Sequence, residues 1–104
     1  MLSSAVIQQR IAALPQPVQD YLYSEKVGAL NVRIIDRNGL TEEQEPGLFG
    51  ILSEVTVKEI GLEHLVPEIT ARLGLDESRA RQLAADIAGY RLLPLDKWLG
   101  DVTG

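Results

Sequence analysis

The strongest constraint on the fold is a pair of helical patterns that meet at Leu73-Gly74-Leu75-Asp76. Apolar residues recur at intervals of three and four on both sides of this turn: Leu62, Leu65, Val66, Ile69 and Leu73 before it, and Ala80, Leu83, Ala84, Ile87 and Ala88 after it. Such spacing places the apolar residues on one face of each helix. The segment from Leu62 to Tyr90 is therefore predicted to be two amphipathic helices joined by a short turn.

The composition favours a small all-α protein. The chain has 104 residues, of which 45% are hydrophobic, 24% are charged and only 5% are aromatic. This length suits a single helical domain, residues 1–104, whose core of Leu, Ile, Val and Ala fits helix faces. We expect a compact bundle or orthogonal array of five to six short helices.

The sequence also narrows the chemistry and the compartment. It contains no cysteine, which excludes disulfides, thiolate metal sites and a cysteine nucleophile. Residues 1–6 include no Lys or Arg and polar residues soon follow, so no signal peptide is expected. No apolar stretch approaches the roughly 20 residues that span a bilayer. We therefore expect a cytoplasmic protein with no membrane partner.

Caps and prolines mark the helix boundaries in the first half of the chain. Residues 1–16 are predicted to form an N-terminal helix or arm, capped by Ser3 or the serine after it. Pro17 suits the first position of a short second helix. Ser24 is expected to cap a third helix that stops at Asn38-Gly39, although the second and third segments could form one bent helix.

The next helix is predicted to start at Thr41-Glu42-Glu43-Gln44, which has the spacing of a capping box. In that motif the Thr41 side chain accepts from the Gln44 amide, and the Gln44 side chain reaches back. The β-branched run Val55-Thr56-Val57 favours a strand locally, but it continues the apolar stripe of this helix. We therefore predict helix through this run, with Gly61 as its stop.

Two residues set the boundaries of the last helices. Pro67 would remove a hydrogen bond from a helix beginning at Leu62, so the regular helix is expected to begin nearer Val66. Asp76 is the predicted cap of the final helix, which runs to about Leu93. Residues 101–104 are expected to form a loose tail.

Four segments resemble a recurrent pattern: Val18-Gln19-Asp20-Tyr21-Leu22-Tyr23-Ser24, Asn38-Gly39-Leu40-Thr41, Leu73-Gly74-Leu75-Asp76 and the final helix from Ala84 to Leu99. They make the chain similar, over roughly Pro17 to Leu99, to small uncharacterised all-helical proteins of candidate-phylum bacteria. In that pattern the proline of the penultimate helix comes earlier than Pro67. The resemblance implies a compact all-α fold and no assigned activity, so no functional residue is carried over.

A helix-turn-helix DNA-binding protein is one functional interpretation of the 69–88 helix pair. Arg79, Arg81 and Gln82 would lie on the helix offered to the major groove, where Arg and Gln can bind base edges. The net charge of -5 and the carboxylates of the same helix count against nucleic acid. Those carboxylates are Asp76, Glu77 and Asp86.

No residue set predicts a catalytic, cofactor or metal site. His64 is the only histidine, and it has no serine partner or paired histidine at zinc-helix spacing. We expect it at the surface near a helix start. Glu42, Glu43 and Glu45 could bind a hard cation, but their place at a helix start explains them through the helix dipole. The sequence therefore favours a protein that is not an enzyme and has no cofactor.

The remaining class is a protein-interaction or self-association module, which is the function we expect. Val18 and Leu22 favour burial of Tyr21, which leaves Tyr23 exposed. Phe49 falls one position off the apolar stripe of its helix, and exposed aromatic residues are frequent interface anchors. Trp98 is expected to cover the core instead. A protein partner or a homo-oligomer formed through the long helices would fit these residues.

Overall fold

The structure is a computed structural model that describes residues 3–92 and Leu95. These residues form six α-helices and no strand. The helices are α1 (Ser4–Ala12), α2 (Gln16–Leu22), α3 (Glu25–Asn38), α4 (Glu45–Thr56), α5 (Leu65–Leu73) and α6 (Glu77–Asp86). A 3-10 turn, η1 (Leu62–His64), precedes α5, and a π-helical segment, η2 (Ile87–Leu92), continues α6. The all-α prediction is confirmed, whereas the predicted tail at 101–104 and Trp98 lie outside the described residues.

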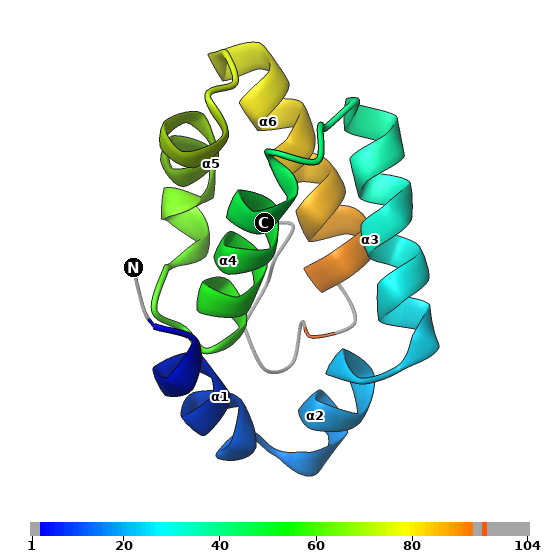
Figure 1. Ribbon diagram of the computed structural model, residues 1–104, viewed down its shortest axis with the longest axis vertical. Coiled ribbons are helices and arrows are strands. Elements are labelled where there is room, and N and C mark those ends of the chain that lie inside the picture. The colour runs from blue at the N-terminus through cyan, green and yellow to red at the C-terminus, as the bar shows by residue number, and fades with distance from the viewer. Residues whose placement is uncertain (1–2, 93–94, 96–104) are drawn as a thin grey trace.

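Helix α4 runs through the middle of the molecule (Figure 1). Helix α5 packs against α4 and α6, and α3 packs against α6 and η2. The main core includes the predicted apolar faces of both helices around Gly74, with Ile69, Ala80, Leu83 and Ile87 fully buried. A smaller cluster joins Leu14 of the α1–α2 turn to the α2 side chain of Val18 and to Leu95.

The predicted helix starts are largely correct. The side chain of Ser3 caps α1 by accepting from the Val6 amide at 3.3 Å. Pro17 is the second residue of α2, one position later than predicted, and α2 and α3 are separate helices. Ser24 occupies the N-cap position of α3, but its hydroxyl donates to the Tyr21 carbonyl at 2.6 Å and does not cap the helix.

The predicted capping box at Thr41 forms only in part. The Gln44 side chain accepts from the Thr41 amide at 2.9 Å, as predicted. The Gln44 amide, however, donates to the backbone carbonyl of Thr41, so residues 41–44 form a turn and α4 begins at Glu45. The side chain of Gln44 also donates, through Nε2, to the Leu73 carbonyl, and this bond links the start of α4 to the end of α5.

The predicted stop of α4 at Gly61 is wrong. The helix ends at Thr56, and Lys58 takes the left-handed conformation with φ of 63°. This conformation lets the Glu59 amide donate to the Glu54 carbonyl at 2.8 Å, which satisfies a helix end that glycine more often closes. Gly61 is the nearest glycine after the helix, but the chain turns three residues earlier, at Lys58.

The turns around α5 agree with the sequence. Helix α5 begins at Leu65, so Pro67 lies in its first turn, where no backbone hydrogen bond is lost. Gly74 closes the helix with φ of 68°, and the Asp76 side chain then caps α6 by accepting from the Arg79 amide at 2.8 Å. The π-helical turns that follow α6 carry no signal that helical periodicity could detect.

Candidate functional site

Two of the three residues of the DNA-binding hypothesis make polar contacts within the chain. Arg79, Arg81 and Gln82 are all exposed on α6. Arg81 pairs with Glu77 at 2.6 Å, and both side chains are exposed. Arg79 donates through Nη2 to the Asn38 carbonyl at 3.0 Å, so it caps the C-terminal end of α3.

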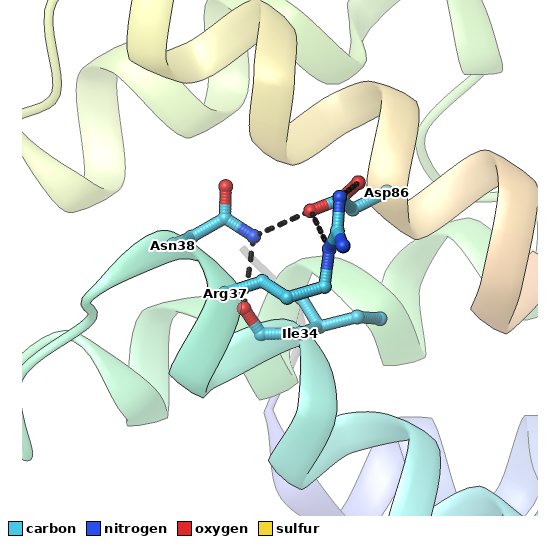
Figure 2. Close-up of polar contacts among 4 residues, drawn as sticks. All are labelled: Ile34, Arg37, Asn38 and Asp86. Atoms are coloured by element: carbon cyan, nitrogen blue, oxygen red, sulfur yellow. Dashed lines mark hydrogen bonds and ion pairs between the residues drawn. The ribbon is translucent and has the colours of Figure 1, made fainter.

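Asp86 lies on α6, as the sequence indicated, but it is buried and adds no carboxylate to the exposed side of the helix. The residue is 7% exposed and faces α3 (Figure 2). Arg37 donates to both of its oxygens, through Nε at 3.2 Å and Nη2 at 3.4 Å, and Nδ2 of Asn38 donates at 2.9 Å. The same Asn38 nitrogen also donates to the Ile34 carbonyl at 2.8 Å. A buried carboxylate needs such donors, so Asp86 joins α6 to α3.

Tyr90 adds to the polar contact between α3 and α6. The guanidinium carbons of Arg33 and Arg37 lie 5.3 Å and 5.4 Å from the centre of its ring, within the range of cation–π attraction. The hydrogen bond to Asp86, followed by the charges of Asp86 and Tyr90, raises the pKa of Arg37 above its ordinary value. Arg37 therefore stays charged wherever the fold is stable.

A small polar pocket lies at the same contact between α3 and α6. Its volume is about 120 Å³, and it is lined by Arg37, Asn38, Leu75, Arg79 and Gln82. We call it the α3–α6 pocket. The structure thus combines two of the three predicted α6 residues with two α3 residues that the sequence did not single out.

A second buried carboxylate, Glu54 on α4, also escaped sequence reasoning. It is 1% exposed, and Arg72 of α5 donates to both of its oxygens. Arg72 is also paired with Glu68 at 2.8 Å. The hydrogen bond to Glu54 is the largest cause of a raised Arg72 pKa. The signal in the sequence was the position of Glu54 three residues after Ile51, at the edge of the apolar stripe.

Gly47 and Gly50 leave room for this contact. A Cβ at Gly47 would lie 3.2 Å from the Leu73 Cδ1, so α4 and α5 approach closely there. A Cβ at Gly50 would lie 3.8 Å from both Nη1 of Arg72 and Oε2 of Glu54. These glycines therefore serve the packing of α4 on α5.

An apolar groove lies where α3 and α4 meet the first two helices. Tyr23 is 75% exposed and Phe49 is 40% exposed, as expected from their positions, while Tyr21 is half-buried. Both exposed aromatic residues line one groove of about 190 Å³. Its other lining residues are Ile11, Leu22, Val27, Asn31, Leu52, Ser53 and Thr56. We call this site the Tyr23–Phe49 groove.

His64 lies at the surface, next to Glu63 at 3.7 Å and at the start of α5, as predicted. Among residues 3–92 and Leu95, no three His, Asp or Glu side chains gather as metal ligands would. Of the three glutamates at 42, 43 and 45, only Glu45 lies in the first turn of α4. Over the described part of the chain, no helix has the length and apolar character needed to cross a bilayer.

No protein-family model matches the chain, and the chain has no significant similarity to a curated protein or to a solved structure.

Proposed function

We propose that this protein is a small, non-enzymatic helical module that binds protein through the Tyr23–Phe49 groove. The observation that carries the proposal is the clustering of exposed apolar side chains. Among the described residues, the large exposed hydrophobic side chains are Tyr23, Val32 and Phe49, and two of these three line the same groove. Contiguous exposed apolar surface of this kind marks interaction sites in water-exposed domains.

The occupant that we propose is a second copy of the chain. A two-fold symmetric interface must be self-complementary, so one face has to carry both a projecting group and a cavity that receives it. Tyr23 is the projecting group, and the groove beside it is the cavity. Tyrosine is also an effective anchor because it contributes a large apolar ring with few rotatable bonds.

Helices α3 and α4 supply most of the groove, which agrees with an interface through the long helices. The groove of about 190 Å³ admits one side chain, so we propose a small interface and a weak association. Interfaces below about 1,200 Å² are typical of transient complexes, and we expect a dissociation constant on the order of 10 to 1,000 µM.

Sedimentation equilibrium over a range of protein concentrations tests the proposal. The wild-type chain should show a monomer–dimer equilibrium, and Tyr23→Ser should shift it toward monomer at least tenfold. Val32→Ser is the matched control, because Val32 is 58% exposed but does not line the groove. A wild-type chain that stays monomeric at millimolar concentration would remove the second copy as the occupant. An equal effect of Val32→Ser would remove the groove as the interface.

A helix-turn-helix DNA-binding role is the second candidate. It is favoured by the exposure of Arg79, Arg81 and Gln82 on a helix that follows a glycine turn. The pairing of Arg81 with Glu77 and the net charge of -5 weigh against it. From the sequence alone, we also propose that the protein is cytoplasmic and that it resembles the small all-helical proteins of candidate-phylum bacteria.

A further inference from the structure

The α3–α6 pocket holds hydrogen-bond donors that the fold leaves unused. In the described part of the chain, no hydrogen-bond acceptor is found for Nη1 of Arg37, for Nη1 or Nε of Arg79, or for the side-chain amide of Gln82. All three residues line the same pocket, and they come from two helices. A pocket lined by cationic and amide donors is suited to an oxyanion.

The charges around the pocket support this assignment. Two arginines line it and no carboxylate does. Asp86 offsets one positive charge, but its oxygens already accept three hydrogen bonds from Arg37 and Asn38. The nearby Asp76 carboxylate accepts from the Arg79 amide as the cap of α6.

We propose that the α3–α6 pocket binds a phosphoryl group, with Arg37, Arg79 and Gln82 as its donors. A phosphoryl group carries about -1.5 to -2 charges and three acceptor oxygens at neutral pH. The three acceptor oxygens match three donor side chains more closely than a carboxylate, which has two oxygens. The volume of about 120 Å³ leaves room for an oxyanion.

This site is separate from the Tyr23–Phe49 groove, since the two share no lining residue. It also gives Arg79 a role beyond its contact with the Asn38 carbonyl, because only Nη2 makes that contact. Because the pocket is open to solvent, we expect an affinity for inorganic phosphate on the order of 1 mM.

A titration with inorganic phosphate, at ionic strength held constant with sodium chloride and followed by two-dimensional NMR, tests the proposal. The side-chain amide signals of Asn38 and Gln82 should shift saturably. Arg79→Gln should weaken binding at least tenfold, and Gln82→Ala, which leaves the α3 cap intact, should weaken it several-fold. Arg81→Gln is the matched control, since Arg81 lies on the same helix but outside the pocket. It should leave the affinity unchanged.

Three results would overturn the proposal. The first is a shift that fails to saturate or that chloride reproduces, which would indicate only ionic strength. The second is acetate binding as tightly as phosphate, which would contradict the phosphoryl assignment. The third is an equal loss in Arg81→Gln. Phosphoserine and a short DNA duplex separate the sources of the phosphoryl group: phosphoserine binding with the same dependence on Arg79 supports a monoester, whereas duplex binding without binding of inorganic phosphate contradicts this pocket.

Discussion

Arg72 on α5 donates to both carboxylate oxygens of Glu54 on α4, although Glu54 is only 1% exposed. The contact joins two helices whose backbones approach closely at Gly47. A buried ion pair adds modest net stability compared with an apolar pair, but it makes each partner dependent on the other. The pair therefore fixes how α4 and α5 pack together.

Replacing Arg72 should be strongly destabilising. Arg72→Met keeps an unbranched apolar stem but leaves the Glu54 carboxylate buried without its cation, and we expect a loss of about 3–5 kcal/mol in the free energy of unfolding. Arg81→Met is the matched control, because Arg81 also pairs with a glutamate four residues away but is exposed, and it should change stability by less than about 0.5 kcal/mol. Urea denaturation of both variants measures the difference. Equal losses would mean that the buried contact does not stabilise the fold.

The loss in Arg72→Met should not change between about pH 7 and pH 10. The Arg72 pKa is raised, chiefly by the hydrogen bond to Glu54, so the guanidinium contributes its stabilisation below its ordinary pKa and loses it only as the pH rises through the raised value. That value lies beyond the range of the experiment. A loss that shrinks steadily toward pH 10 would contradict a charged Arg72 as the source of the effect.

Two glycine-to-alanine substitutions should have opposite signs. Gly74 has φ of 68° and no atom within 4 Å of an added Cβ, so Gly74→Ala introduces backbone strain without a clash and should destabilise by about 1 kcal/mol. Gly28 lies inside α3 with equal free space and ordinary helical backbone, so Gly28→Ala should stabilise by about 0.5–1 kcal/mol. Thermal unfolding of the pair checks both signs. A stabilising Gly74→Ala would mean that the turn is not left-handed.

The sequence predicted the features that depend on local rules. Helical periodicity located the buried faces around Gly74, and the preferences of Ser3 and Asp76 located two helix starts. Rules based on residue type failed where a residue other than glycine takes the left-handed conformation at a helix end, as Lys58 does after α4.

The candidate sites depend on contacts between distant segments, which periodicity cannot pair. Nothing in the sequence links Asp86 to Arg37, 49 positions away, so its burial could not be predicted. Glu54 and Arg72 are 18 positions apart and on different helices. The exposure of Tyr23 could be predicted from its own helix, but the groove beside it required the arrangement of four helices.

Leu83 provides a test of the core. It is fully buried between helices, and Leu83→Asp would place an unpaired charge there, so we expect a loss of several kcal/mol, roughly 3 or more. Ala85→Asp on the exposed side of α6 should be tolerated within about 1 kcal/mol. Circular dichroism with chemical denaturation distinguishes the two variants. A neutral Leu83→Asp would show that the assigned core face is wrong.

The DNA-binding candidate makes a prediction of its own. If α6 reads base edges, duplex binding at low salt should be detectable and should weaken tenfold or more in both Arg79→Ala and Arg81→Ala. Because Glu77 pairs with Arg81 and the net negative charge repels a polyanionic duplex, we expect no duplex binding in fluorescence anisotropy. Sequence-dependent binding lost in both variants would favour DNA over the protein-interaction role.

The central claim is that Tyr23 of one copy enters the groove of another. Isotope-filtered NMR on a mixture of labelled and unlabelled chains detects contacts between copies alone. We expect nuclear Overhauser effects from the Tyr23 ring of one copy to the methyl groups of Val27 and Leu52 in the other, and their loss when Phe49→Ser opens the groove. Contacts between copies that involve Val32 but neither Tyr23 nor Leu52, or no such contacts at millimolar concentration, would contradict the claim.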